Sequence, residues 1–158
     1  MKFIILGLDH FGSSLAENLT HMGHHIVAVD SYMRLVEMVK EKVTLAICLN
    51  AKDANAIKKL PLENTDAAIV CIGSNEGENI IITALLKKMD VKRIISRSVS
   101  SLQEDILEAI GITQIIRPEF ESEQRWAMKL STKDYVDLFE VIKDNNVTEM
   151  YVPKKLIG

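Results

Sequence analysis

Short apolar runs alternate with amphipathic stretches along most of this chain, and this alternation restricts the possible folds more than any other feature of the sequence. Six apolar runs occur, at residues 3–6, 25–29, 45–49, 67–72, 93–96 and 114–116. Between them, helical stretches with apolar residues three and four positions apart begin near Phe11, Tyr32, Asp53, Asn75, Ser100 and Pro118. This order is typical of βαβ units, and continuous apolar strands are typical of a sheet that is covered on both faces. The sequence therefore predicts an α/β fold, a Rossmann-like, doubly wound, parallel sheet of six strands.

The composition is that of an ordinary globular protein. The chain has 158 residues, 47% of them hydrophobic and 26% charged, with a formal net charge of -3. That balance argues against a general nucleic-acid binder. No apolar run approaches the ~18 residues of a membrane-spanning helix, and the run at residues 3–6 is too short for a signal peptide. We therefore expect a cytoplasmic protein, which would serve a membrane only as a separate subunit.

The two cysteines lie inside apolar runs and far apart. Cys48 and Cys71 form neither a C-x-x-C pair nor a cysteine-histidine pattern, so no disulfide framework or zinc site is indicated. We expect both thiols to be reduced and buried.

The last forty residues break the alternation. Pro118 is expected to open a helix that runs to about Ser131, and residues 136–142 and 148–152 are expected to form two short strands around a turn. Two strands alone are too few to bury a face. We therefore divide the chain into a nucleotide-binding domain at residues 1–131, which includes the crossover helix, and the start of a C-terminal domain at residues 132–158. Either the natural protein continues past Gly158 or this tail packs on another subunit.

The first strand-to-helix turn carries most of a dinucleotide-binding motif. It reads Gly7-Leu8-Asp9-His10-Phe11-Gly12, which keeps the outer glycines of G-x-G-x-x-G and replaces the middle one with Asp9. Asp30 ends the second apolar run, where an acid can bind ribose hydroxyls. This order predicts an adenosine-nucleotide site. The alternative is a nucleotide-free domain in which Gly7 makes the turn, Gly12 packs and Asp30 caps the next helix.

Asp9 complicates the phosphate site. A carboxylate ~5 Å from a phosphate is repelled by roughly 3 kcal/mol in an effective dielectric of about 20. A bridging cation, a ligand with a single phosphate, or an Asp9 side chain that bonds its own loop would relieve the conflict. Over these three arrangements we favour an unrelieved repulsion, in which the carboxylate faces the phosphates and weakens pyrophosphate binding.

Several turns, taken in order, resemble one family. They are residues 5–12, the Gly23 turn into residues 25–30, and the turns at residues 50–51, 72–75 and 117–119. Together they resemble the RCK/KTN domains of the TrkA N-terminal type, the cytosolic regulatory subunits of bacterial potassium transport systems. The resemblance covers about residues 1–131, and residues 136–158 look like the start of the family's C-terminal domain. It implies regulation of a membrane potassium channel or transporter by NAD(H), ATP, ADP or AMP, with subunits paired into dimers and assembled in a ring.

The resemblance also assigns roles to individual positions. Gly7 and Gly12 match the phosphate loop, Asp30 matches the ribose acid, and Arg97 matches a basic position that faces phosphates. Glu119 matches a family acid implicated in cation-linked nucleotide sensing. Four more residues match the edge of the adenine pocket and the turn over the ligand, namely Asn50, Ala51, Ile72 and Gly73.

Two positions within the loop depart from the family pattern. Asp9 replaces the middle glycine, and His10 stands where transporter subunits often carry an arginine that reaches a neighbour's terminal phosphate. Phe11 completes the loop and is assigned to the same nucleotide site.

The sequence shows no catalytic motif. G-x-S-x-G, H-E-x-x-H and a Walker lysine are absent, and 158 residues leave no room for the substrate domain of a dehydrogenase. We therefore expect a non-enzymatic sensor. The alternatives are a small NAD-dependent redox enzyme, with Cys71 exposed near the pocket mouth, and a redox-sensing regulator of transcription. No helix-turn-helix or basic patch supports the regulator.

Two helical stretches are expected to contact a second subunit. Residues 79–86 are apolar on more than one face, which fits core packing on one side and a subunit contact on the other, or core packing alone. Trp126 lies outside the six-strand unit, where we expect a dimer contact.

Overall fold

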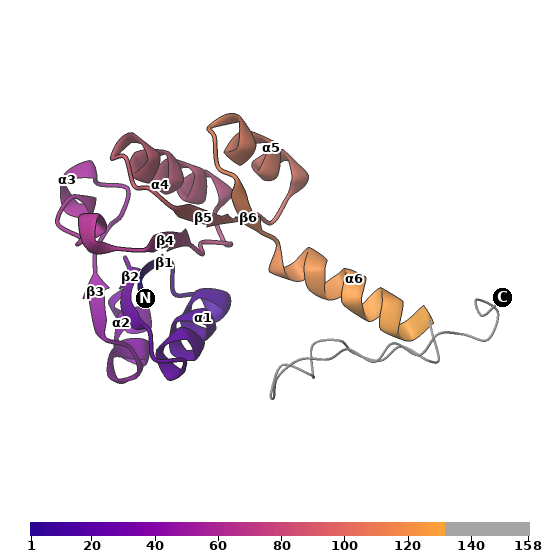
Figure 1. Cartoon of the computed structure of the whole chain (residues 1–158), viewed down its shortest axis with the longest axis horizontal. Coiled ribbons are helices and arrows are strands. Elements are labelled where there is room, and N and C mark those ends of the chain that lie inside the picture. The colour runs from indigo at the N-terminus through magenta and orange to yellow at the C-terminus, as the bar shows by residue number, and fades with distance from the viewer. Residues whose placement is uncertain (132–158) are drawn as a thin grey trace. The chain divides into compact units, whose positions relative to one another are not determined.

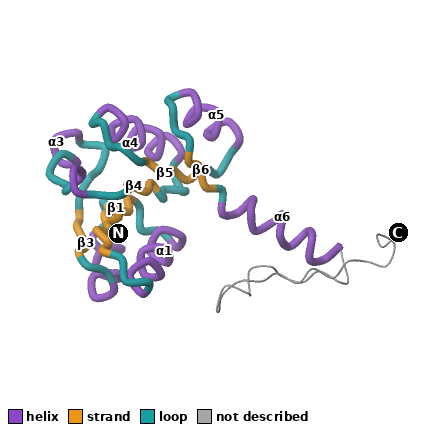
Figure 2. The backbone as a smooth tube through the Cα atoms, viewed as in Figure 1, coloured by secondary structure: helices purple, strands orange, loops and turns teal. Residues whose placement is uncertain are grey.

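A six-stranded, all-parallel sheet organises the first 117 residues of the computed structural model, which describes residues 1–131 (Figure 1). The strands are β1 (Lys2–Leu6), β2 (His25–Asp30), β3 (Leu45–Cys48), β4 (Ala67–Val70), β5 (Ile94–Arg97) and β6 (Gln114–Ile116). The helices are α1 (His10–His21), α2 (Met33–Val39), α3 (Ala54–Ile57), α4 (Glu76–Lys88), α5 (Ser101–Ala109) and α6 (Pro118–Ser131). Each strand and helix predicted within residues 1–131 is present, with strand bounds within two residues of those expected (Figure 2). The two short strands expected at residues 136–142 and 148–152 lie outside the described residues.

The strand order confirms the predicted doubly wound topology. The sheet runs β3-β2-β1-β4-β5-β6, so the chain starts near the middle, builds outward to β3, then crosses over β1 to β4 and builds to the other edge. Neighbouring strands β1 and β4 therefore lead into loops that diverge to opposite faces of the sheet. In such sheets, ligands bind at this switch point, beyond the carboxyl ends of the strands.

The two faces of the sheet are covered by separate apolar cores. In β1, Ile4 and Leu6 belong to one core and Phe3 and Ile5 to the other, because successive side chains of a strand point to opposite faces. Helices α1 and α2 lie on one face, and α4 and α5 lie on the other (Figure 1). Burial on both faces explains why the central strands read as unbroken apolar runs.

Short polar side chains cap the starts of four described helices, α1, α3, α4 and α5. Asp9 accepts a hydrogen bond from the Gly12 amide at the start of α1. Asn75 caps α4 through the Glu78 amide, and Ser100 caps α5 in the same way. These caps place the helix starts within one residue of the expected positions.

The edge strand β3 corrects one expectation. Cys48 is exposed rather than buried, whereas Cys71 is buried as predicted. The apolar run at residues 45–49 is continuous, but β3 has a neighbour on one side only, and Leu45 is also exposed. An apolar run by itself does not distinguish an edge strand from a central one.

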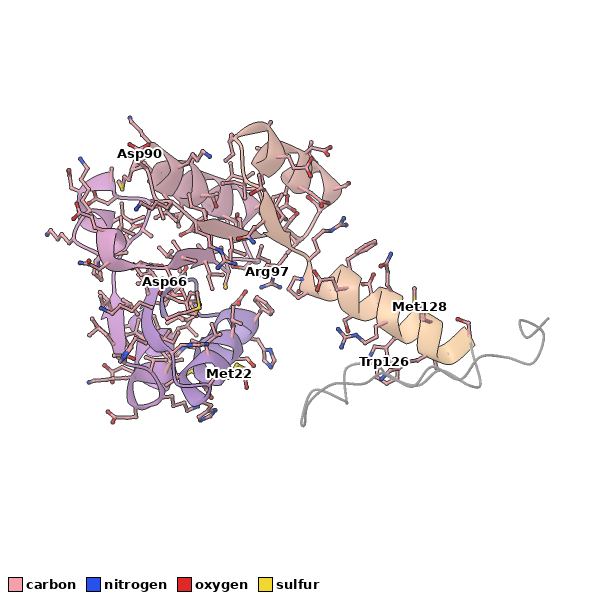
Figure 3. All side chains as sticks on the ribbon, viewed as in Figure 1. Met22, Asp66, Asp90, Arg97, Trp126 and Met128 are labelled. Atoms are coloured by element: carbon pink, nitrogen blue, oxygen red, sulfur yellow. The ribbon has the colours of Figure 1, made fainter. Side chains whose placement is uncertain are left out.

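The chain divides into two units, one of them Met1–Arg117 and the other beginning at Pro118. The second unit contains α6, which runs to Ser131 as predicted. Trp126 and Met128 project from opposite sides of α6 (Figure 3), and both are more than half exposed. The domain division at residues 131 and 132 remains a prediction. Within the described residues, every helix falls short of the length and apolarity needed to cross a membrane.

Candidate functional site

Close backbone packing requires glycine at two positions of the first loop. Gly7 has a positive φ of 95°, and a Cβ atom there would lie 2.9 Å from the backbone nitrogen of Ile72. A Cβ atom on Gly12 would lie 1.9 Å from the carbonyl oxygen of Gly7. Side chains are therefore excluded at both positions because α1 and the β4–α4 turn approach the loop closely.

The Asp9 side chain folds back onto its own loop, so the outward orientation favoured from the sequence was wrong. Oδ1 accepts a hydrogen bond of 3.1 Å from the Gly12 amide, which is one of the free amides in the first turn of α1. Oδ2 accepts a 2.9 Å hydrogen bond from Nη1 of Arg97 and forms an ion pair with it. The carboxylate is one third exposed, and it still contributes to the wall of the cleft described below.

Arg97 is buried at the carboxyl end of β5, where it holds Asp9. Its side chain is labelled in Figure 3, and its exposed fraction is 7%. Besides its bond to Asp9, Nη1 donates to the carbonyl oxygen of Cys71 at 3.2 Å, and the guanidinium lies 5.2 Å from the centre of the Phe11 ring. A Cβ atom on Gly73 would lie 2.6 Å from Cζ of Arg97, so the missing side chain leaves room for the guanidinium.

Asp30 joins the end of β2 to the glycine loop. Oδ2 accepts a 2.7 Å hydrogen bond from the Leu8 amide, and Oδ1 accepts a 2.8 Å bond from the Tyr32 amide. Tyr32 is the residue before α2, whose start has no side-chain cap. Asp30 therefore shapes the turn rather than capping α2. Each carboxylate oxygen keeps a second lone pair that can accept a hydrogen bond from a ribose hydroxyl.

A cleft opens at the carboxyl ends of β1 to β4, at the topological switch point. It encloses about 540 Å³ of space, a figure that includes its open mouth. Its lining comprises Leu6, Gly7, Asp9, Val29, Asp30, Ser31, Tyr32, Leu35, Leu49, Ala51, Ile72, Ser74, Glu78 and Ile82. Apolar side chains from both sheet faces thus meet a small number of polar groups.

The cleft brings together five of the residues assigned to the nucleotide site. They are Gly7, Asp9, Asp30, Ala51 and Ile72. Six others are outside its lining: His10, Phe11, Gly12, Asn50, Gly73 and Arg97. His10 is exposed, and the Asn50 side chain accepts a hydrogen bond from the Lys52 amide. Glu119 belongs to α6, in the second unit. The cofactor-binding roles of these residues remain predictions.

Sequence reasoning missed several lining residues. Ser31, Tyr32 and Leu49 directly follow strand ends, and a rule that includes the first residues after each strand would have found them. Glu78 and Ile82 are one helical turn apart on α4. Their side chains reach the cleft because of the way α4 packs against β4 and β5, which no local pattern in the sequence reports.

A buried polar network supports the turn over the cleft. Asn79 donates to the carbonyl oxygen of Ile72 at 3.0 Å, and its own Oδ1 accepts a 2.9 Å bond from Ser96. The Ser96 and Thr83 hydroxyls are 3.1 Å apart, and all three network side chains are buried. The network ties α4 to β5 behind the Ile72 turn.

Burial makes Cys71 a poor redox group. The pKa of its thiol is raised to about 12, mainly by removal from water and also by the nearby Asp9 carboxylate, while Arg97 acts in the opposite direction. The reactive thiolate is therefore scarce at neutral pH. Cys71 is also outside the cleft lining, so the arrangement that the redox-enzyme alternative needs, with Cys71 exposed near the pocket mouth, is not found.

The strand order, the glycine turn and the cleft at the switch point define the first unit as a Rossmann-type α/β domain. The family model of the TrkA-N domain matches residues 3–118, and the chain belongs to this family. Ktr system potassium uptake protein A of Bacillus subtilis is 30% identical over 155 residues, which cover 98% of this chain and 70% of that protein. The family predicted from the turns is confirmed.

Solved structures share the fold. The NAD(P)-binding domain of an exopolyphosphatase-related protein from Archaeoglobus fulgidus superposes with a TM-score of 0.73 and 22% identity, covering 82% of this chain and 96% of that one. The Kef CTD of Shewanella denitrificans, in AMP-bound form, gives a TM-score of 0.70 and 18% identity, covering 83% and 82%. At these identities the likeness concerns the fold alone.

Proposed function

We propose that this protein is a cytoplasmic regulatory subunit that binds an adenosine nucleotide and controls a membrane potassium channel or transporter. One observation carries the nucleotide part: the Asp30 carboxylate and the Gly7 turn meet in a cleft at the switch point of a doubly wound sheet. The transport part rests on similarity to a Ktr potassium uptake protein along 98% of the chain.

The cleft suits an adenosine moiety. Apolar side chains of Leu35, Leu49 and Ile82 offer a surface for the base. Asp30 accepts two backbone hydrogen bonds and has two further lone pairs for the ribose hydroxyls. The fold neighbours include a domain described as NAD(P)-binding and one described as AMP-bound, which supports an adenosine ligand for this chain.

Calorimetry against NAD, NADH, ATP, ADP, AMP and adenosine tests the binding part. Asp30→Ala should weaken binding by roughly 1.5 to 3 kcal/mol, because a hydrogen bond between ribose and a charged acceptor is lost. Asp66→Ala is the matched control, since Asp66 also accepts a backbone hydrogen bond, from Lys2 at 2.6 Å, but lies outside the cleft lining. Equal affinity of the Asp30 variant and the parent would remove Asp30 from the site.

The regulatory part makes two further claims. The pure protein should bind its nucleotide without turnover. Steady hydride transfer would favour the small redox enzyme instead, and steady hydrolysis would also contradict a non-enzymatic sensor. In liposomes that contain the membrane subunit of a Ktr-type system, adding the protein should make potassium flux depend on the nucleotide. A potassium flux that changes with neither the protein nor the nucleotide would contradict the proposal.

A further inference from the structure

The Asp9 carboxylate occupies the contacts that a phosphate would make at the start of α1. A helix N-terminus attracts anions through its free amides, and here Oδ1 of Asp9 accepts from the Gly12 amide at 3.1 Å. The neighbouring cation is engaged as well, because Nη1 of Arg97 donates to Oδ2 of Asp9 at 2.9 Å. The chain therefore supplies its own anion at the phosphate-binding end of the loop.

The charged residues of the cleft also oppose the binding of linked phosphates. Three carboxylates contribute to its lining, those of Asp9, Asp30 and Glu78, whereas the described lining contains no lysine, arginine or histidine. Lys52 pairs with Glu78 at 3.5 Å from outside the lining. A ligand that places two linked phosphates in this cleft meets carboxylates on its walls and an occupied amide at the helix start.

A metal ion bound by the protein would offset the negative charge of these carboxylates. Among the described residues, no group of three or more histidine, cysteine, aspartate or glutamate side chains is arranged to hold a metal ion. The carboxylates of the cleft therefore do not form a preformed site with three or more protein ligands for a cation.

We propose that Asp9 is a specificity-determining residue, which makes the cleft select an adenosine nucleoside or monophosphate over ligands with a pyrophosphate. This inference rests on the proposed adenosine site and names its ligand class. A single phosphate can turn toward solvent, whereas the linked phosphates of NAD, ADP or ATP reach further and carry more charge, and in this fold a pyrophosphate lies along the glycine loop at the helix start. Folding back does not relieve the conflict, because the bonds that hold Asp9 are the ones a pyrophosphate needs.

Two neutral variants of Asp9 test the proposal. Asp9→Asn and Asp9→Ser remove the charge and keep a side chain able to cap α1. Repulsion between two charges ~5 Å apart corresponds to roughly 100-fold in affinity. We expect both variants to bind ADP and NAD about 10- to 100-fold more tightly than the parent does, and adenosine within about 3-fold of it. Thermal unfolding of each variant verifies that it is folded.

Asp53→Asn is the matched control. Asp53 also caps a helix, α3, through a 2.8 Å bond from the Asn55 amide, but it lies outside the cleft lining. Its substitution should leave the affinity for every ligand unchanged. A comparable gain in this variant would mean that net charge, rather than the position of Asp9, controls the affinity, and would overturn the proposal.

The outcomes separate this inference from the proposed function. For the parent chain we expect adenosine and AMP to bind at least about tenfold more tightly than ADP, ATP and NAD. If the parent binds NAD or ADP tightly and Asp9→Asn and Asp9→Ser bind them no more tightly, the role of Asp9 is overturned. The proposed nucleotide site would then still hold. Magnesium-dependent ATP binding that is lost in Asp9→Asn also overturns it, because Asp9 would then hold the cation. Failure of the parent to bind any member of the series overturns the proposed function itself.

Discussion

Replacing Gly12 with alanine tests whether the glycine loop is as tightly packed as its geometry indicates. The added Cβ would lie 1.9 Å from the Gly7 carbonyl oxygen and 3.1 Å from Cβ of Cys71. Overpacking of this kind costs about 1–3 kcal/mol, and the upper end applies because the nearest atom is backbone. Alanine is also the better helix former by about 1 kcal/mol. The clash outweighs the gain, so Gly12→Ala should lower the free energy of unfolding by roughly 2 kcal/mol.

Gly77→Ala is the matched control, because Gly77 also lies in the first turn of a helix, α4. Its added Cβ would meet only the Asn75 side chain, at an ordinary contact distance of 3.5 Å. We therefore expect a gain of about 0.5–1 kcal/mol from helix propensity alone. Urea unfolding measures both variants, and with a slope of about 1–3 kcal/mol per molar their midpoints should move in opposite directions.

Equal or higher stability of Gly12→Ala would refute this reasoning. It would mean that the β1–α1 loop moves away from the helix at no cost, so that close packing does not require glycine there. A loss of stability in Gly77→Ala would show instead that glycine-to-alanine changes at helix starts are harmful in general, and the comparison would not support a specific clash at Gly12.

Three further predictions concern stability, thiol chemistry and assembly. Asn79→Ala should cost about 1–3 kcal/mol in urea unfolding, because a buried hydroxyl of Ser96 and a backbone carbonyl lose their partner; an unchanged midpoint contradicts this. A thiol reagent at neutral pH should label Cys48 alone in the folded protein and both cysteines in urea. Because the pKa of Cys71 rises from 9.0 to about 12 on folding, the thiol loses its proton at lower pH in the unfolded state than in the folded one. The free energy of unfolding should therefore fall as the pH rises from 9.0 toward about 12. Sedimentation should show at least a dimer, weakened by Trp126→Ala, since Trp126 is 57% exposed on α6; a monomer at micromolar concentration would disprove it.

Local patterns predicted the elements well because their physical causes are local. Strands buried on both faces read as apolar runs, and polar caps such as Asn75 and Ser100 precede the helices that they start. The error at Cys48 has the opposite cause. Whether a strand lies at the edge of a sheet depends on the order in which strands assemble, and a single apolar run carries no information about that order.

The candidate site was predictable only in part. Gly7 and Asp30 lie directly at strand ends, so their convergence follows from a parallel sheet. Glu78 enters the cleft through the placement of α4, which depends on the packing of a whole helix against the sheet. Its role in the wall of the cleft therefore could not be inferred from its neighbours in the sequence.

The sequence by itself determined the order of strands and helices, the glycines of the loop and the acid at the end of β2. The tertiary structure decided what surrounds Asp9. Its partner Arg97 is 88 positions away. The two meet because β4 lies between β1 and β5 in the sheet, and because Gly73, in the turn after β4, leaves space for the guanidinium. An ion pair of this separation depends on strand order and on a missing side chain in a third segment, so the direction of the Asp9 carboxylate became known only once the sheet was assembled.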